Sequence, residues 1–258
     1  MKQVLIIPDR RDVEGSITLA RDYNAGFEYN DFTTPDVLDD KDKSEQMIRN
    51  YQKSDLPKSS TVHGAFYDVI PFSLDSKIRE ISDLRIRQSI AIAKQIKAKG
   101  VIFHTNYNPF LNSATYVKSW IEANAAYWSR TLEENPEVNI YLENMFDVTP
   151  DLLEQLSEQL CQYTNFGVCL DYAHAFLSKE APAEWAKRLS RFVKHIHIND
   201  NDGISDLHMA WGDGIIPKEE FYQCYNRYLN GADILVETSG NENIKKSLLR
   251  LKEDGFLE

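Results

Sequence analysis

The sequence of 258 residues predicts a single (β/α)8 TIM barrel, and three observations lead to this fold class. Eight short apolar runs, mostly rich in β-branched residues, alternate with longer amphipathic runs. Strand and helix repeated eight times in about 250 residues is typical of this barrel. No Pro-, Gly- or Ser-rich linker and no internal repeat divides the sequence, so we expect residues 1–258 to form one domain.

The expected strands are short runs that are apolar on both faces, as buried parallel strands usually are. They are VLIIP from Val4, GFEYN from Gly26, TVHG from Thr61, VIFH from Val101, VNIYLE from Val138, FGVCLD from Phe166, VKHIHI from Val193 and DILVE from Asp233. A doubly wound open sheet is the alternative, but it usually has a glycine-rich first turn. The first turn here reads PDRRDVEG and lacks G-x-G-x-x-G, which favours the closed barrel.

The expected helices lie between these strands, and their apolar residues are spaced three and four apart. The clearest run from Ser76 to Lys99, Thr115 to Glu134, Asp151 to Cys161 and Glu219 to Leu229. Thr149 and Pro150 provide a start signal for the third of these helices. Pro182 and Pro217 mark the beginnings of the next two helices in the same way.

Composition limits the classes of partner. A net charge of −11 argues against a partner held mainly by phosphate contacts, such as duplex DNA. The first apolar run is too short for a signal peptide, and no stretch approaches the roughly 20 apolar residues of a membrane span. Cys161, Cys169 and Cys224 form no C-x-x-C pair, so we expect reduced thiols in a cytoplasmic protein.

Histidines and carboxylates stand at the ends of successive expected strands. In (β/α)8 barrels the chemistry is built at the carboxyl ends of the strands. One such residue alone is usually structural, but here the last six strands all end in this way. The residues at or just after the strand ends are Glu28, His63, His104, Glu143, Asp171, His174, His197, Asp206, His208 and Glu237.

A mixed set of histidines and carboxylates suits a divalent first-row ion, and we expect zinc or manganese. The set is densest in HIHINDNDGISDLHMAWGDG, from His195 to Gly214. A calcium loop is the alternative for its DNDG stretch, but Ile198 and Met209 would then occupy ligand positions that need oxygen donors.

Other residues of the same segment are expected to be structural. We expect His195 to face the other side of the sheet from His197. The aspartates Asp200, Asp202 and Asp213 are expected in turns or loops. Gly212 and Gly214 are expected in tight turns that bring the backbone near the site.

Four segments, YLEN, CLDYAHA, HIHINDNDGISDLHMAWGDG and LVETSG, resemble the xylose isomerase-like TIM-barrel superfamily. This superfamily contains sugar isomerases and epimerases, and also the endonuclease IV type of DNA-repair enzyme (AP endonuclease family 2). The resemblance covers nearly the whole chain and is clearest from His63 to Gly240. Its D-x-x-H and D-x-H motifs are specific for the superfamily, but not for a substrate.

The resemblance implies a set of metal ligands. The residues that look like the metal quartet of the epimerases are Glu143, Asp171, His197 and Glu237. In those enzymes the equivalents of Glu143 and Glu237 also handle protons. In the endonuclease type, His63, His104 and Glu143 would hold a second ion, with Glu143 bridging, and His174, Asp206 and His208 a third. The full set permits one to three ions and either chemistry.

The loops after the strands favour a sugar over DNA. A repair nuclease grips several phosphates, normally with Lys, Arg and backbone amides. Only Arg10 and Arg11, after the first strand, offer cations near this face. The segments without Lys or Arg are NDFTTPDVLDD, GAFYDVIPFSLDS, TNYNPFLNSATYV, NMFDVTPDLLEQ, YAHAFLS, NDNDGISDLHMAWGDGIIP and TSGNENI.

Aromatic residues beside Asn and Asp in these loops suit a neutral polyol. The aromatics are Phe66, Tyr67, Tyr107, Phe110, Phe146 and Trp211. From these loops, the predicted substrate-binding residues are Phe66, Tyr107, Asn144 and Trp211.

We therefore expect a divalent-metal-dependent sugar or sugar phosphate isomerase or epimerase that works through an enediolate, with Glu143 and Glu237 as acid and base. The alternatives are an endonuclease IV-like trinuclear-zinc phosphodiesterase acting on abasic DNA and a non-catalytic, metal-containing sugar-binding barrel. A phosphate could dock on Arg10 and Arg11, or on the backbone amides of residues 238–240. The expected partner is a small carbohydrate, with nucleic acid disfavoured and the oligomeric state left open.

Overall fold

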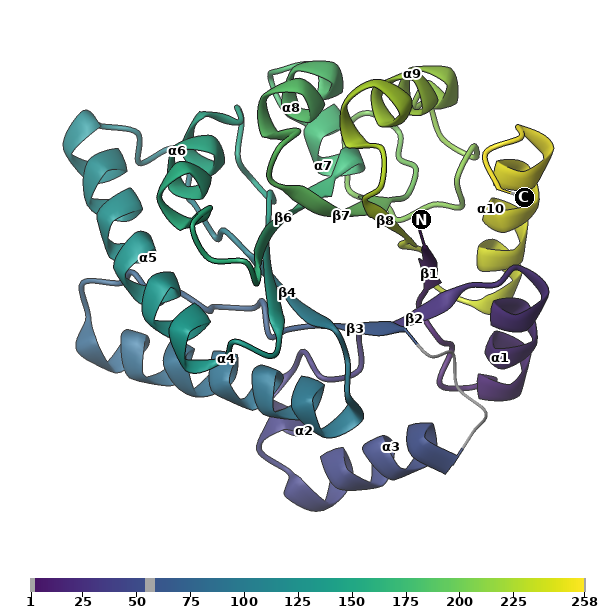
Figure 1. Ribbon diagram of the computed structural model, residues 1–258, viewed down its shortest axis with the longest axis horizontal. Helices are drawn as coiled ribbons and strands as arrows, with labels where there is room; N and C mark the ends of the chain where they lie inside the picture. Colours follow the sequence, from purple (N-terminus) through teal and green to yellow (C-terminus); the bar gives the residue numbers. More distant parts are fainter. Residues whose placement is uncertain (1–2, 54–58, 258) are drawn as a thin grey trace.

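The computed structural model describes residues 3–53 and 59–257, and its strands form a closed parallel barrel in sequence order (Figure 1). Each strand pairs with the next, and β8 pairs with β1 to close the sheet. The strands are β1 (Val4–Ile6), β2 (Gly26–Tyr29), β3 (Ser60–His63), β4 (Gly100–His104), β5 (Asn139–Glu143), β6 (Phe166–Asp171), β7 (Val193–Ile198) and β8 (Asp233–Val236). The predicted fold class is confirmed.

The helices surround this barrel on the outside (Figure 1). They are α1 (Val13–Asp22), α2 (Pro35–Leu38), α3 (Lys41–Lys53), α4 (Ser76–Ile96), α5 (Ala114–Glu134), α6 (Asp151–Leu160), α7 (Tyr172–Leu177), α8 (Pro182–Leu189), α9 (Lys218–Cys224), the π-helical turn η1 (Tyr225–Leu229) and α10 (Asn241–Glu253). No helix in the described part of the chain is both long and apolar enough to cross a membrane.

Local signals explain most helix ends. Asp75 caps α4 by accepting a hydrogen bond from the Lys77 amide at 2.8 Å. The same helix ends at Ile96, earlier than predicted, because Lys97 adopts a left-handed conformation with φ 61°. The helix predicted from Glu219 to Leu229 changes to π-helical geometry at Tyr225. Pro182 is the first residue of α8, as its sequence position predicted.

Successive layers of side chains fill the barrel interior. Residues two apart along a strand point to the same side, so the residue two positions before a strand-end ligand lies in the layer beneath it. Ile102, Tyr141 and Cys169 occupy this lower layer as a small buried apolar cluster. Glu28 and His195 are also fully buried in the structure, so part of the interior is polar.

Candidate metal centre

Strands β3 to β8 bring the predicted ligands together at one end of the barrel. The ligand atoms form three groups, within each of which all atoms lie within 4.8 Å of one another. The groups are His63, His104 and Glu143; Glu143, Asp171, His197 and Glu237; and His174, Asp206 and His208.

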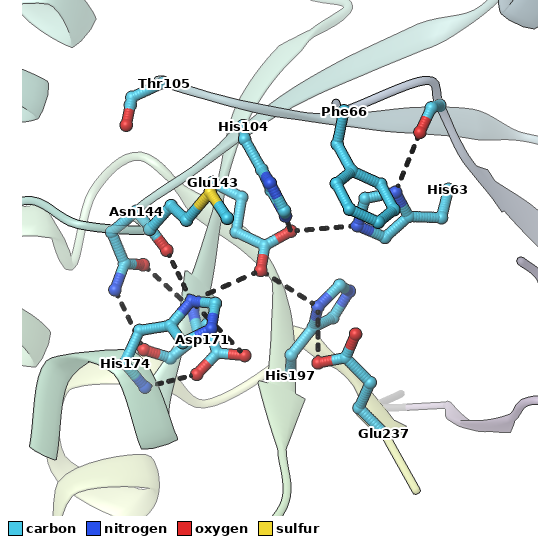
Figure 2. A network of polar contacts seen from close by, with 12 residues as sticks. His63, Phe66, His104, Thr105, Glu143, Asn144, Asp171, His174, His197 and Glu237 are labelled. Carbon is cyan, nitrogen blue, oxygen red and sulfur yellow. Dashed lines mark hydrogen bonds and ion pairs between the residues drawn. The ribbon is translucent and has the colours of Figure 1, made fainter. Parts of the chain in front are cut away.

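Glu143, at the end of β5, lies at the centre of the site (Figure 2). Its Oε2 atom is 3.5 Å from His63 Nε2 and 3.4 Å from His104 Nε2. Its Oε1 atom is 3.3 Å from His197 Nδ1. The two oxygens therefore face different ligand groups, and a carboxylate in this position can bridge two ions.

The quartet is buried and is positioned by backbone contacts. Asp171 ends β6 and caps α7, because its Oδ1 atom accepts a hydrogen bond from the His174 amide at 2.6 Å. Its other oxygen is buried and has no hydrogen-bond partner among the described residues. Glu237 follows β8, and its Oε2 atom is 3.2 Å from His197 Nδ1.

The third group lies nearer the surface. Asp206 Oδ2 is 3.2 Å from His174 Nε2 and 3.0 Å from His208 Nε2. His208 has φ 48°, a conformation that few residues other than glycine adopt. Hydrogen bonds hold it in place: Thr238 Oγ1 donates to its carbonyl at 2.8 Å, and its Nδ1 atom lies 3.1 Å from the Glu237 carbonyl oxygen.

Carbonyl oxygens determine which histidine nitrogens face the site. A carbonyl only accepts hydrogen bonds, so a ring nitrogen bonded to it must carry the proton. His63, His174 and His208 each bond a backbone carbonyl through Nδ1, at 3.0, 2.8 and 3.1 Å. Their Nε2 atoms therefore face the site. Those of His174 and His208 donate to Asp206 Oδ2, and each Nε2 atom offers a lone pair to a metal ion once its proton is lost. His197 is reversed, because its Nδ1 atom faces Glu143 and Glu237.

The electrostatics of the site suit a cation. Several buried polar atoms have no hydrogen-bond partner among the described residues: both carboxylate oxygens of Glu143, Asp171 Oδ2, Glu237 Oε2 and both ring nitrogens of His197. Three buried carboxylates and one imidazole match the ligands of zinc or manganese. The donor set therefore fits a divalent ion.

The pKa values reflect this concentration of charge. Burial raises the pKa of Asp171 to about 7, although His174 opposes the shift. Burial alone would raise the pKa of Glu237, but the positive charges of His197 and His208 lower this pKa to about 2. Burial lowers the pKa of His208, yet the hydrogen bond to Asp206 and the charge of Glu237 raise it to about 10. Without an ion, protons on the histidines balance the negative charge of the carboxylates; a bound ion would take over this role and displace those protons.

Asp200 anchors the loop of residues 199–217 that carries Asp206 and His208. Its carboxylate accepts hydrogen bonds from the amides of Asn201, Gly212 and Ile216, at 2.9, 2.9 and 3.1 Å. Its backbone pairs with that of Met209 in an isolated bridge. A Cβ atom on Gly214 would lie 2.2 Å from the Asn201 carbonyl oxygen, so close packing requires glycine there. The loop is thus organised by its own residues.

Phe66 and Tyr107, two of the predicted substrate-binding residues, lie beside the site. The Phe66 ring is 5.3 Å from the His63 ring and 5.2 Å from the His104 ring, measured between centroids. Tyr107 lines a cleft of about 700 Å³ that has His174 and Asp206 among its lining residues. The size suits a small-molecule ligand, and exposed Phe110 and Phe146 also line it.

The structure corrects the other two members of the predicted substrate-binding set. Trp211 is 0 % exposed; its ring packs on Phe221, and its Nε1 atom donates to the Tyr222 hydroxyl at 3.2 Å. It belongs to the core. Both ends of the Asn144 side-chain amide bind the backbone of Asp171 at 2.9 Å. Asn144 therefore holds the backbone of Asp171, a predicted ligand, and its amide is already engaged on both sides.

The prediction that His195 faces the other side of the sheet from His197 was wrong. The two residues are two apart on β7, so both side chains point to the same side. Both rings approach Glu28, and their centroids are 5.2 Å apart. The Tyr141 ring stacks on His195 with an interplanar angle of 11°. Among the predicted ligands, the ring contacts and ion pairs of His195 reach only His197.

Sequence reasoning did not assign Glu28 to the site. Glu28 Oε1 is 3.1 Å from His197 Nε2, and Glu28 Oε2 is 2.9 Å from His195 Nε2. Thr61 donates a hydrogen bond to the same Oε2 atom at 2.6 Å. A glutamate inside the expected strand GFEYN was the available signal, because a charged residue is rarely fully buried without a partner.

Comparison with known proteins gives related barrels. The family described as "Xylose isomerase-like TIM barrel" matches residues 19–254. The uncharacterized protein MJ1311 of Methanocaldococcus jannaschii is 29 % identical over 203 residues, which cover 74 % of this chain and 68 % of that protein. A D-tagatose 3-epimerase-like protein aligns with a TM-score of 0.76 and 23 % identity, covering 98 % of this chain and 96 % of the other. D-psicose 3-epimerase with D-tagatose, from Clostridium cellulolyticum H10, aligns with a TM-score of 0.70 and 11 % identity, covering 100 % and 99 %.

Proposed function

Because this chain belongs to the xylose isomerase-like TIM-barrel family, we propose that it is a divalent-metal-dependent isomerase or epimerase of a small sugar. The observation that carries the proposal is the buried quartet, in which Glu143 and Glu237 both contact His197 Nδ1, at 3.3 and 3.2 Å. Two carboxylates that face one cation site are suited to move a proton on a substrate bound between them.

The quartet residues would hold the ion: Glu143, Asp171, His197 and Glu237. A divalent ion in this position supplies Lewis-acid stabilisation of the negative charge that develops on a sugar carbonyl oxygen. The protein contributes ligands that are already oriented. Asn144 fixes Asp171, and the end of β5 fixes Glu143. Little reorganisation is then needed when the substrate charge develops.

Glu143 and Glu237 are the proposed acid and base. One carboxylate removes the proton from the carbon next to the carbonyl, and the electron pair left on that carbon forms an enediolate of the sugar. A carboxylic acid on the opposite face then returns a proton. Return to the same carbon inverts its configuration, and return to the former carbonyl carbon interconverts aldose and ketose.

The remaining predicted ligands would bind substrate hydroxyls if the site holds a single ion. They are His63, His104, His174, Asp206 and His208. In His63, His174 and His208 the Nδ1 atom donates to a carbonyl oxygen, so Nε2 is the ring nitrogen that would meet a substrate hydroxyl. Phe66 packs against two of these histidines and offers an apolar face for the substrate carbons.

A neutral sugar suits the charges around the site better than a sugar phosphate. Arg10 and Arg11 line a separate corner of about 330 Å³ with Asp9, Asp31 and Gly240. Arg11 forms an ion pair with Asp9 at 2.8 Å, and Arg10 lies 4.0 Å from Asp31. These carboxylates already offset both cations, so the corner has little net charge with which to attract a phosphate.

Cleavage of abasic DNA is the second candidate, because all three ligand groups are assembled in the structure. The charge of the chain opposes it. With a net charge of −11, the protein repels a polyanion that must lie across a broad surface. A non-catalytic sugar-binding barrel is a weaker reading, since binding alone needs no such set of ligands.

Two assays separate these functions. Protein saturated with zinc or manganese is incubated in deuterium oxide with a panel of aldoses and ketoses, and exchange at the carbon next to the carbonyl is followed by NMR. An abasic duplex oligonucleotide is tested with the same preparations, and bound metal is counted by elemental analysis. We expect exchange into at least one sugar and its loss in Glu143→Gln. Nicking of the oligonucleotide at physiological salt, with no sugar exchange, would overturn the proposal.

A further inference from the structure

Glu28 lies in the barrel interior, directly behind a proposed metal ligand. It is 0 % exposed and comes from β2, which contributes no predicted ligand to the site. Its Oε2 atom accepts hydrogen bonds from Thr61 and His195, at 2.6 and 2.9 Å. Its Oε1 atom lies 3.1 Å from His197 Nε2. The Glu28 carboxylate therefore contacts both His195, in the layer beneath the site, and His197, in the site itself.

His197 differs from the other histidines in what stands behind it. Three of the others place Nδ1 against a backbone carbonyl: His63, His174 and His208. His197 instead turns Nδ1 toward Glu143 and Glu237 and Nε2 toward Glu28. A carboxylate behind a ligand imidazole makes it a stronger electron donor, because the negative charge favours electron density on the nitrogen that binds the ion.

The two facing atoms, Glu28 Oε1 and His197 Nε2, are 3.1 Å apart, and the Cys169 thiol lies within 4.8 Å of a His197 ring nitrogen. Glu28 Oε1 and His197 Nε2 are both buried, and neither makes a hydrogen bond of standard geometry within the described ranges, so the two are held at an ion-pair distance. A charged carboxylate buried in a barrel interior is costly unless it is paired. Thr61 and His195 engage only one of its oxygens. The other oxygen lies 3.1 Å from His197 Nε2, a separation at which it can accept the Nε2 proton.

We propose that Glu28 is a positioning residue that accepts the Nε2 proton of His197 and so directs the Nδ1 lone pair of His197 toward the metal ion. The inference rests on the metal site of the proposed function, but not on the identity of its substrate. Glu28 itself touches neither substrate nor ion. Its effect is on the tautomer and orientation of one ring.

The first test is Glu28→Gln, which keeps the shape of the side chain and removes its charge. The matched control is Asp147→Asn, because Asp147 is also buried near the site but hydrogen-bonds to Thr105 and Met145 rather than to a histidine within the described chain. Zinc affinity is measured by competition with a chromophoric chelator, and the thermal stability of the metal-free proteins is measured alongside. We expect Glu28→Gln to bind zinc about 10- to 100-fold more weakly, and Asp147→Asn to change affinity by less than that range.

Metal affinity distinguishes a positioning role from a purely structural one. If Glu28 only stabilised the fold, Glu28→Gln would lower the stability of the metal-free protein and leave zinc affinity at the wild-type value. That result would overturn the inference. It would also be overturned if Asp147→Asn weakened zinc binding as much as Glu28→Gln, because the effect would then follow from any lost buried charge.

A second measurement needs no variant. Long-range 15N–1H correlation spectra of zinc-loaded wild-type protein report which nitrogen of His197 carries a proton. We expect a protonated Nε2 and a metal-bound Nδ1; zinc on Nε2 would refute the assignment. Both measurements are independent of catalysis. If no sugar is turned over but Glu28→Gln still weakens zinc binding, the proposed function fails and this inference stands.

Discussion

Replacing Glu143 by Gln is the most informative perturbation of the site, because this carboxylate belongs to two ligand groups at once. Gln keeps the size of the side chain and removes the charge. Its neighbours His63, His104 and His197 lie within 3.5 Å of its two oxygens. Replacing a residue that only hydrogen-bonds to a metal ligand typically weakens metal affinity by up to about 100-fold. Glu143 is itself a proposed ligand, so we expect Glu143→Gln to weaken affinity by at least that factor.

The expected size of the effect follows from linkage. At a metal concentration 100 times its dissociation constant, one ion stabilises the folded protein by about 2.7 kcal/mol. A 100-fold weaker site at the same concentration gives about 0.4 kcal/mol. One kcal/mol corresponds to roughly 2–4 °C in Tm for a chain of this size, so a metal-induced shift of about 5–11 °C falls to about 1–2 °C.

Scanning calorimetry with and without metal measures this shift, and elemental analysis counts the ions. The difference between metal-free and metal-loaded Tm is compared within each variant, so any effect on the metal-free fold cancels. Asp213→Asn is the control, because Asp213 pairs with Lys246 and Arg250 outside the site. If Glu143→Gln kept the full shift and the wild-type ion count, Glu143 would not be a ligand and the assignment of the site would be wrong.

Three further predictions concern the same structure. Glu237→Ala should lose at least one bound ion by elemental analysis, and an unchanged count would exclude Glu237 from the quartet. Zinc affinity of the metal-free protein should rise with pH between about pH 6 and pH 9, by up to about tenfold per pH unit for each proton displaced. The hydrogen bond to Asp206 and the charge of Glu237 raise the pKa of His208 to about 10 despite its burial, so the ion competes with that proton; isothermal titration at several pH values checks this, and a flat profile contradicts it. Trp211→Phe should lower the free energy of unfolding by about 1 kcal/mol, through loss of the hydrogen bond to Tyr222, and leave sugar exchange intact. A variant of normal stability that lost exchange would return Trp211 to the substrate site.

The barrel could be predicted because its signals are local. Each strand is a short apolar run, and parallel strands bring their carboxyl ends to one face whatever the details of packing. The nine predicted ligands therefore lie together in three groups in the structure. Helix ends were less predictable, as at Lys97, because they depend on single backbone conformations.

The side chains around the ligands could not be assigned in this way. Trp211 lies in the same loop as His208, but its ring turns into the core to pack on Phe221, and the sequence around it does not reveal that tertiary contact. Glu28 stands near the end of its strand, but the ligand set that the resemblance implies does not include it. Its contact with His197 joins residues 169 positions apart, and a pattern within one strand carries no information about such a partner.

The loop held by Asp200 has a consequence for how such a barrel could change over evolutionary time. The loop is held by hydrogen bonds to the Asp200 carboxylate and by close packing at Gly214, and none of these contacts uses the side chain of Asp206 or His208. Single replacements at those two positions would dismantle the outermost ligand group without unfolding the segment that carries it. The ligands at the mouth of the barrel can therefore change while the fold of the loop stays the same. A lineage could gain or abandon an outer ion by point mutation while the quartet deeper in the barrel continued to work.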